Sequence, residues 1–222
     1  MPLIARDFIA GHIAEDAARA RAEYFAEFRT DIEGYISREV VEAAVGDFWE
    51  LPPASGISYK AFVDPSGGAQ DSFTLAIAHK KAQQIIIDAV REIRPSFSPA
   101  AAIDELSVLV KRYRVWQVTG DHYAGEFPRD LFRKHGISYR VCKSPKSDLY
   151  RDLLPLLNSG RIVLPRNERL IGQIVGLERR VSRAGKDSIN HGPSGHDDVA
   201  NCVAGVAAVL LSSNYNLDAL AS

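Results

Sequence analysis

The sequence has 222 residues, of which 46% are hydrophobic and 25% are charged, and this composition is typical of a globular protein with one sizeable core. No apolar run reaches the roughly 18 residues that a membrane-spanning helix requires, and the N-terminal MPLIARDFIAGHIAED lacks the apolar stretch of a signal peptide. The only two cysteines, Cys142 and Cys202, favour a reducing, cytoplasmic setting. We therefore expect a soluble protein with no membrane partner.

The net charge of −1 does not indicate a nucleic-acid-binding protein, but the charges are distributed unevenly. Residues 6–50 hold eleven acidic side chains and five basic ones, whereas residues 129–146 hold six basic side chains and one acidic one. Part of the surface could therefore attract a polyanion. Solvated helix surfaces would explain the same charges equally well.

The N-terminal part of the chain is acidic, and residues 14–45 show the three- and four-residue apolar spacing of one or two helices. The sequence LPPASG at 51–56 then interrupts any regular structure, because helices and central strands both reject proline. We predict an acidic helical connector over residues 1–54, a folded domain over residues 55–212 and a C-terminal tail over residues 213–222.

The folded domain begins with three β-rich runs whose short links predict an antiparallel meander. Strands and helices alternate after it, so the predicted fold is α/β: a mixed sheet of five or more strands, first antiparallel and then parallel, flanked by helices. The predicted strands are 58–64, 72–80, 83–90, 115–121, 137–142 and 161–165. The predicted helices are 99–113, 125–136, 145–160, 167–182 and 194–210, with residues 183–195 as a Gly- and Ser-rich loop.

Acidic residues stand at special places in this layout. Asp64 ends the first predicted strand, Asp121 ends the fourth, and Asp197 and Asp198 begin the last helix. If the first and fourth strands are neighbours, these carboxylates gather at one edge of the sheet and repel one another unless protons or cations neutralise them. Hard divalent ions prefer such oxygen ligands, and two of them roughly 4 Å apart can promote phosphodiester hydrolysis.

Each of these acids also has a purely structural interpretation. Asp64 and Asp121 suit turns, Asp197 suits the N-cap of the last helix, and Asp198 in its first turn interacts favourably with the helix dipole. We expect Asp197 to cap the helix while Asp198 reaches the other acids. Gly205 costs about 1 kcal/mol relative to alanine inside a helix, so its presence predicts close packing of this helix on the sheet.

The ordered set of motifs resembles the nuclease domain of phage large terminase subunits, the DNA-packaging motors of tailed bacteriophages. The motifs are FVDPSGG, DSFTLAI, VTGDHYAGEFPRDLFRKHGISY, KSDLYRDLLPLLNSGRIVLP and GHDDVANCVAGVAA, and EYFAEFRTD resembles the family's connector between motor and nuclease. The resemblance spans nearly the whole chain. It implies an RNase H-like fold and an endonuclease that cuts concatemeric double-stranded DNA with two Mg²⁺ or Mn²⁺ ions.

The resemblance also implies roles for particular residues. Asp64, Asp121 and Asp198 match the catalytic, metal-binding acids, with Asp197 as a further candidate ligand. Related sequences often carry one more Asp three residues after Asp198, but this chain has Asn201 there, which weakens any claim for a fourth carboxylate.

Further candidates are auxiliary or DNA-binding residues. The auxiliary candidates are His196 and His122, each of which is more simply explained as a loop residue. Candidate phosphate contacts are Arg133, Arg140, Lys143 and Lys146.

The implied partners are DNA, a motor ATPase domain of the same full-length protein, the small terminase subunit and the portal, in the cytoplasm of the bacterial host. No G-x-x-x-x-G-K-[ST] motif occurs, so we expect no ATP hydrolysis by this chain and regard it as the C-terminal portion of a longer protein.

Another RNase H-like DNA enzyme, such as a junction resolvase or transposase, remains an alternative. So does a non-catalytic DNA-clamping or motor-docking module. The length excludes a sugar-kinase-like or actin-like ATPase, which needs two such domains.

Overall fold

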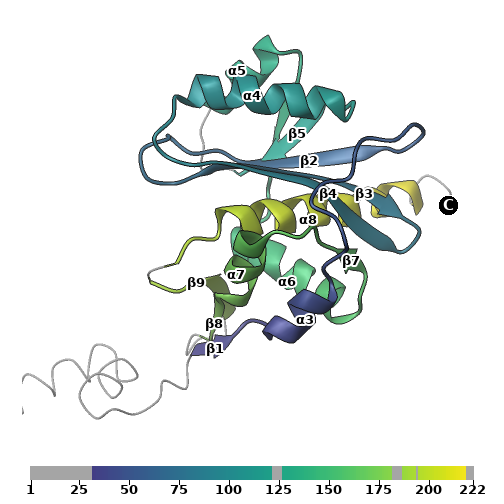
Figure 1. The fold of residues 1–222 in the computed structure, drawn as a ribbon, viewed down its shortest axis with the longest axis vertical. Coiled ribbons are helices and arrows are strands. Elements are labelled where there is room, and N and C mark those ends of the chain that lie inside the picture. The colour runs from purple at the N-terminus through teal and green to yellow at the C-terminus, as the bar shows by residue number, and fades with distance from the viewer. Residues whose placement is uncertain (1–31, 122–126, 182–186, 194, 219–222) are drawn as a thin grey trace, which may run out of the picture.

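The computed structural model of the chain describes residues 32–121, 127–181, 187–193 and 195–218 (Figure 1). Its central feature is a six-stranded mixed sheet with the strand order β6-β5-β2-β3-β4-β7. The strands are β2 (Tyr59–Asp64), β3 (Phe73–Lys81), β4 (Gln84–Ile93), β5 (Gln117–Gly120), β6 (Ser138–Val141) and β7 (Ile162–Val163).

The pairing confirms the predicted topology. Strands β2, β3 and β4 form the antiparallel meander, β5 and β6 continue the sheet in parallel from β2, and β7 pairs in parallel with β4. Parallel neighbours need long crossover connections, and helices supply them here. The helices are α3 (Arg38–Ala43), α4 (Pro99–Arg112), α5 (Phe127–Lys134), α6 (Lys146–Asn158), α7 (Glu168–Val175) and α8 (Asp198–Asp218).

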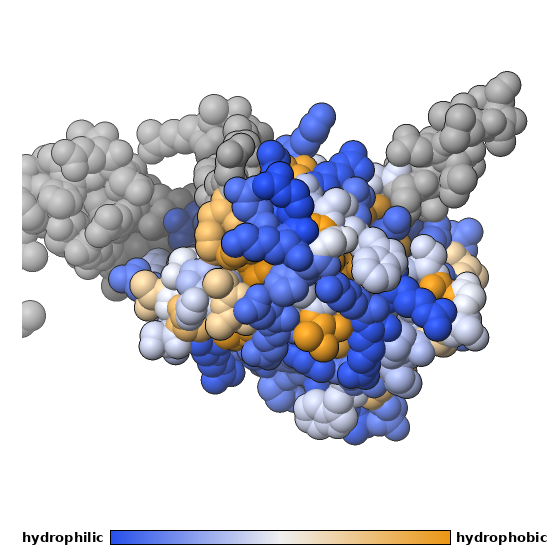
Figure 2. Space-filling model, turned by 90° about the horizontal axis from the view of Figure 1, so that it is seen from above, coloured by the Kyte–Doolittle hydropathy of each residue, from blue (hydrophilic) through white to orange (hydrophobic). Residues whose placement is uncertain are grey.

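Alternating side chains of β2 divide the core into two layers. Ala61 and Val63 belong to the cluster beneath α4 and α5, whereas Phe62 belongs to the cluster of α3, α6, α7 and α8 on the opposite face. This is the two-residue period of a strand that is buried on both faces. The helices therefore cover both sides of the sheet (Figure 1), and the outer surface of α4 and α5 is largely hydrophilic with small separate apolar spots (Figure 2).

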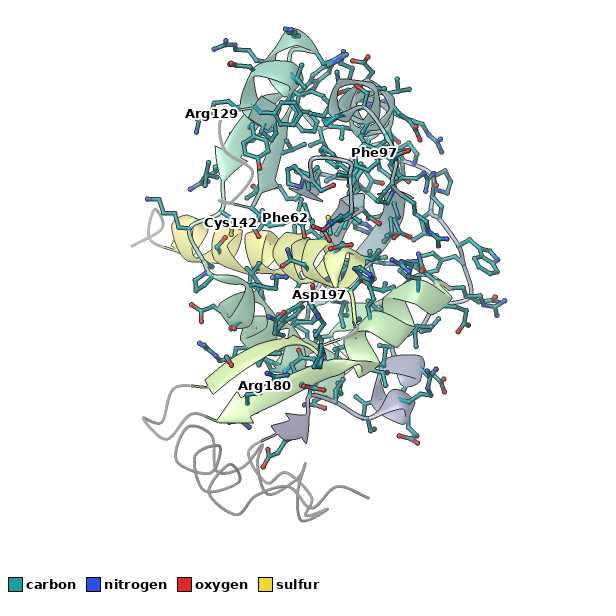
Figure 3. The ribbon with its side chains drawn as sticks, turned by 90° about the vertical axis from the view of Figure 1, so that its left-hand side faces the viewer. Phe62, Phe97, Arg129, Cys142, Arg180 and Asp197 are labelled. Carbon is teal, nitrogen blue, oxygen red and sulfur yellow. The ribbon has the colours of Figure 1, made fainter. Side chains whose placement is uncertain are left out.

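Helix α8 lies directly on the sheet. Ala76 and Ala78 of β3 face it with small side chains, and a Cβ atom added to Gly205 would lie 2.5 Å from the Phe62 ring. The close packing predicted from this glycine is confirmed. Figure 3 shows Phe62 beside the helix and Asp197 at the N-terminal end of the helix.

The prediction for residues 167–195 is wrong in part. Helix α7 ends at its C-cap Gly176, and the next residues form β8 (Leu177–Val181), not a continued helix. The predicted loop contains β9 (Asp187–His191), and both strands join β1 (Ile32–Gly34) in a three-stranded sheet of order β1-β8-β9. Pairing between segments far apart in sequence overrides the weak helical preference of LERRV.

The helical prediction for residues 14–45 is wrong in part where it can be compared. Residues 14–31 lie outside the described part, but Ile32–Gly34 is a strand, and only Arg38–Ala43 of the predicted helical region is helical. Tyr35, Val41 and Ala44 are buried in the same core cluster as α8, so this part of the proposed connector packs against the sheet domain.

At the C-terminal end, α8 continues to Asp218, which is beyond the proposed domain limit at residue 212. None of the helices in the described ranges is both long and apolar enough to cross a membrane.

Candidate functional site

Two of the predicted acids follow adjacent parallel strands. Strand β2 pairs with β5 in a register that places Val63 beside Gly120. Asp64, the last residue of β2, and Asp121, directly after β5, therefore emerge next to each other at the same edge of the sheet. The expected neighbourhood of the first and fourth predicted strands is confirmed.

Helix α8 brings Asp198 to this edge. The Thr74 hydroxyl donates a 2.9 Å hydrogen bond to the backbone carbonyl of Asp198, and Thr74 is the residue opposite Asp64 in the β2–β3 register. One helical turn further, the Cys202 thiol lies 2.8 Å from the Phe62 carbonyl oxygen. The start of α8 is thus tied to β2 and β3 at the point where Asp64 ends its strand.

Asp64 is the most strongly perturbed carboxyl of this group. Burial raises its pKa to about 7, and the negative charges of Asp121 and Asp198 act in the same direction. A 2.7 Å hydrogen bond from Asn201 Nδ2 to Asp64 Oδ2 and the charge of Lys146 favour the ionised form but do not offset the burial. In the absence of a cation, Asp64 is therefore a poorly stabilised carboxylate.

Asp198 is also poorly satisfied. Burial raises the pKa of its carboxyl group, the charges of Asp197 and Asp71 add to the effect, and a backbone hydrogen bond from Ser72 and the nearby His196 oppose it. Its Oδ2 atom is buried without a hydrogen-bond partner among the described residues. A buried anionic oxygen without a partner is costly, so this atom is suited to accept a cation.

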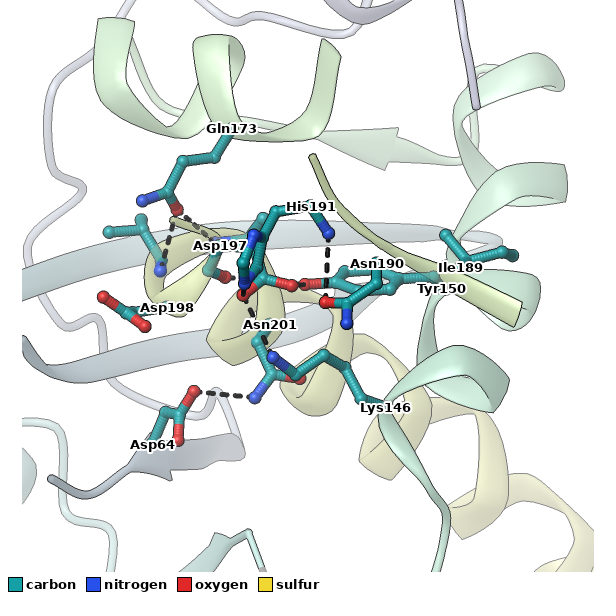
Figure 4. Close-up of polar contacts among 12 residues, drawn as sticks. Asp64, Lys146, Tyr150, Gln173, Ile189, Asn190, His191, Asp197, Asp198 and Asn201 are labelled. Atoms are coloured by element: carbon teal, nitrogen blue, oxygen red, sulfur yellow. Dashed lines mark hydrogen bonds and ion pairs between the residues drawn. The ribbon is translucent and has the colours of Figure 1, made fainter. Parts of the chain in front are cut away.

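Asp197 faces away from Asp64, into a separate polar cluster (Figure 4). Its side chain is 2% exposed; Lys146 Nζ lies 3.0 Å from Oδ1, and the Tyr150 hydroxyl donates to Oδ2 at 2.9 Å. His191 Nε2 lies 4.0 Å from Oδ1. Burial lowers the pKa of Lys146, but Asp197, Asp64 and Asp198 raise it by more, so this lysine is held as a cation.

The expectation that the Asp197 side chain caps α8 is wrong. The amides of Val199 and Ala200, which an N-cap side chain would accept, both donate to Gln173 Oε1 of α7, at 2.9 and 3.0 Å. Both Asp197 oxygens instead face the Lys146 and Tyr150 side chains of α6. The charge of Lys146 outcompetes the backbone amides for the carboxylate.

Most of the remaining predicted residues are exposed. His196 is exposed and lies close enough to Asp198 to lower its pKa, whereas His122 lies outside the described residues. The candidate phosphate contacts Arg133, Arg140 and Lys143 are exposed, and Arg133 forms a 2.9 Å ion pair with Asp130. Lys146 differs from these three, because it is partly buried against Asp197.

Two contributors to the site were missed in the sequence. Tyr150 stands four residues after Lys146, so both lie on one side of α6, and this spacing could have indicated a shared partner. Gln173 is a polar residue on the buried side of α7, between Ile171 and Ile174, and such a position calls for a hydrogen-bond partner.

The donor atoms fit a hard divalent cation, although the side chains do not form a closed cage. Within the described ranges, no group of three or more His, Cys, Asp or Glu side chains is arranged so that it could hold a metal ion. Two buried oxygens next to Asp64 lack hydrogen-bond partners among the described residues, Asp198 Oδ2 and Asn201 Oδ1. Neighbouring carboxylates raise one another's pKa when no cation neutralises them, as for Asp64 and Asp198.

The strand order and the acids at the carboxyl ends of β2 and β5 define an RNase H-like α/β domain with a candidate metal site at one sheet edge. No family model matches the sequence, and no relative is found among the curated proteins. Solved structures, in contrast, match over most of the domain. The large terminase nuclease from thermophilic phage G20c aligns with a TM-score of 0.65 and 16% identity, over 75% of this chain and 94% of that one.

Two further structures agree. The nuclease domain of the large terminase subunit of bacterial virus Sf6 aligns with a TM-score of 0.61 and 14% identity, over 79% of this chain and 98% of that one. The HK97 bacteriophage large terminase has a TM-score of 0.63 and 14% identity, over 92% of this chain but 50% of that one. The fold of this chain is thus the fold of large terminase nuclease domains, as the sequence motifs predicted. The G20c nuclease has been solved with magnesium and with cobalt, and a mutant Sf6 nuclease with manganese.

Proposed function

We propose that this chain is a metal-dependent DNA endonuclease that cuts concatemeric viral DNA during genome packaging, with little sequence specificity. The observation that carries the proposal is the position of Asp64, Asp121 and Asp198 at one edge of a sheet with the terminase nuclease fold. The raised pKa of Asp64 supports it, since a buried carboxyl among other carboxyls is typical of a functional site.

Asp64, Asp121 and Asp198 would hold two Mg²⁺ or Mn²⁺ ions, for which carboxylate oxygens are the preferred ligands. When bound, the ions supply a water nucleophile at neutral pH and stabilise negative charge on the leaving oxygen. Asp197, with both oxygens engaged, would hold Lys146 at the rim of the site instead of serving as a main ligand. His196, exposed next to Asp198, is proposed as an auxiliary residue of the site.

Double-stranded DNA is the proposed substrate. Arg133 of α5, Arg140 of β6 and Lys143 after β6 are exposed side chains that would contact backbone phosphates, and such contacts give affinity without sequence preference. The further partners we propose are a motor ATPase domain of the same full-length protein, the small terminase subunit and the portal, acting in the host bacterial cytoplasm. The alignment over half of the HK97 large terminase supports a place in a longer protein.

Plasmid cleavage in Mn²⁺ or Mg²⁺ tests the proposal. The single variants Asp64→Asn, Asp121→Asn and Asp198→Asn should each lose cleavage while circular dichroism shows an intact fold. Asp47→Asn is the matched control, because Asp47 is 88% exposed and lies away from the three acids. Wild-type rates in all three variants would refute the proposal.

A non-catalytic DNA-clamping module is the second candidate, because the described side chains form no closed metal cage. It predicts no heat of Mn²⁺ binding and no nicking even at high protein concentration. Another RNase H-like DNA enzyme would be recognised by its substrate instead: a junction resolvase should prefer branched DNA to linear duplexes, whereas the proposed endonuclease should cut both.

A further inference from the structure

Asn201 lies beside the candidate metal site and contacts Asp64, one of its acids. It lies three residues after Asp198 on α8, so both side chains project from the same side of the helix. Its side chain is fully buried, and its backbone amide donates a 2.7 Å hydrogen bond to the Asp197 carbonyl, which fixes the first turn of the helix.

The two ends of the Asn201 amide have different surroundings (Figure 4). Nδ2 donates to Asp64 Oδ2 at 2.7 Å, and because an ionised carboxylate only accepts hydrogen bonds, this is the orientation of the amide toward ionised Asp64. Oδ1 is buried and has no hydrogen-bond partner among the described residues. Asn201 thus engages one oxygen of Asp64 and keeps an unused acceptor of its own.

A carboxylate at position 201 would have the opposite effect in the metal-free protein. Two carboxylates 2.7 Å apart must share a proton or a cation, because like charges at this distance cannot both ionise without one. The neutral amide instead attracts Asp64 whether or not a cation is present. It therefore holds this carboxylate in one orientation before any metal binds.

We propose that Asn201 is a positioning residue of the metal site, which holds Asp64 by its Oδ2 atom and leaves Oδ1 of Asp64 to the cation. This inference rests on the proposed function, since it concerns the same ions. Groups that orient a metal ligand by a hydrogen bond contribute strongly to affinity, and their loss typically weakens metal binding about 10- to 100-fold.

Calorimetric titration of the full 222-residue chain with Mn²⁺ provides the test. Asn201→Leu, which has the same branching and number of heavy side-chain atoms but no donor, should bind Mn²⁺ at least about tenfold more weakly than wild type. Asn201→Ser, which keeps a hydroxyl donor, should recover part of the affinity. Ser107→Ala is the control, because Ser107 is a buried helical polar residue on the opposite face of the sheet.

Asn201→Asp gives a second readout that needs no activity. In EDTA this variant should unfold at a lower temperature than wild type, because two carboxylates then face each other. Mn²⁺ should raise its unfolding temperature by more than that of wild type. If the variant is as stable as wild type in EDTA, position 201 does not face the Asp64 carboxylate and the inference is overturned.

The outcomes separate this inference from the proposed function. If Asp64→Asn loses Mn²⁺ binding while Asn201→Leu binds as tightly as wild type, the positioning role is overturned and the metal site stands. If wild type binds no Mn²⁺, or if Asp64→Asn binds it unchanged, the proposed metal site is wrong and the role of Asn201 falls with it.

Discussion

Asp64→Asn should make the metal-free protein more stable at neutral and alkaline pH. Burial raises the pKa of Asp64 from 3.8 to about 7, so its ionised form is unfavourable in the folded state. Each pKa unit corresponds to about 1.36 kcal/mol, so ionising Asp64 lowers the free energy of unfolding by at most about 4 kcal/mol. Asparagine has nearly the same shape, carries no charge and still accepts a hydrogen bond from Asn201.

The sign of the pH dependence follows from proton linkage. Because the folded state binds the Asp64 proton more tightly than the unfolded state, this group stabilises the fold at low pH. That contribution is lost as the pH rises from about 4 to about 7. Above about pH 7, wild type should therefore be less stable than the Asp64→Asn variant. At pH values under about 4, the two proteins should be equally stable.

Thermal unfolding in EDTA between pH 4 and pH 8.5 measures the effect. For a chain of this size, about 1 kcal/mol shifts the unfolding temperature by about 2–4 °C, so the variant should gain up to about 8–16 °C at pH 8. Asp47→Asn should show no such gain, because Asp47 is exposed. If Asp64→Asn is no more stable than wild type at pH 8, Asp64 does not carry the burial penalty from which the metal site is inferred.

Substitutions at three further positions test the packing and the polar cluster. Gly205→Ala should destabilise the fold by about 1–3 kcal/mol in urea denaturation, because its Cβ would lie 2.5 Å from the Phe62 ring; unchanged stability would mean that α8 does not lie so close to the sheet. Tyr150→Phe removes the hydroxyl donor to Asp197 and should cost about 1–3 kcal/mol, measured in the same way. Lys146→Met leaves the buried Asp197 carboxylate without its cation, and we expect a loss of about 3 kcal/mol that Lys146→Arg largely restores; equal loss in both variants would contradict the ion pair.

The meander and the acids at strand ends were predictable because they depend on local patterns. The β-rich composition of 58–64 and 72–80 and the short links between the runs left few alternatives to antiparallel pairing. The acid positions at Asp64, Asp121 and Asp198 followed from the strand and helix limits. The motifs then indicated the terminase nuclease fold, which the solved structures confirm despite identities of 14–16%.

The small sheet was not predictable in the same way. Its strand β1 is far in sequence from the neighbouring strands β8 and β9, and the pairing of Ile32 with Arg180 depends on how the rest of the chain has folded. LERRV has no alternating apolar pattern, so nothing local distinguishes it from an exposed helix. Only the glycine at position 176 indicated that α7 ends there.

The residues around the candidate metal site were likewise predictable only in part. By itself, the sequence determined which side chains carry negative charge, and it placed them at the ends of regular elements, because charge and periodicity are local properties. The tertiary structure decided their partners: Asn201 for Asp64, and Lys146 and Tyr150 for Asp197, with Gln173 taking the capping role. Hydrogen bonds and ion pairs extend only a few ångströms, so those made between different elements depend on how the elements pack, and neither α6 nor α7 is near α8 in the sequence.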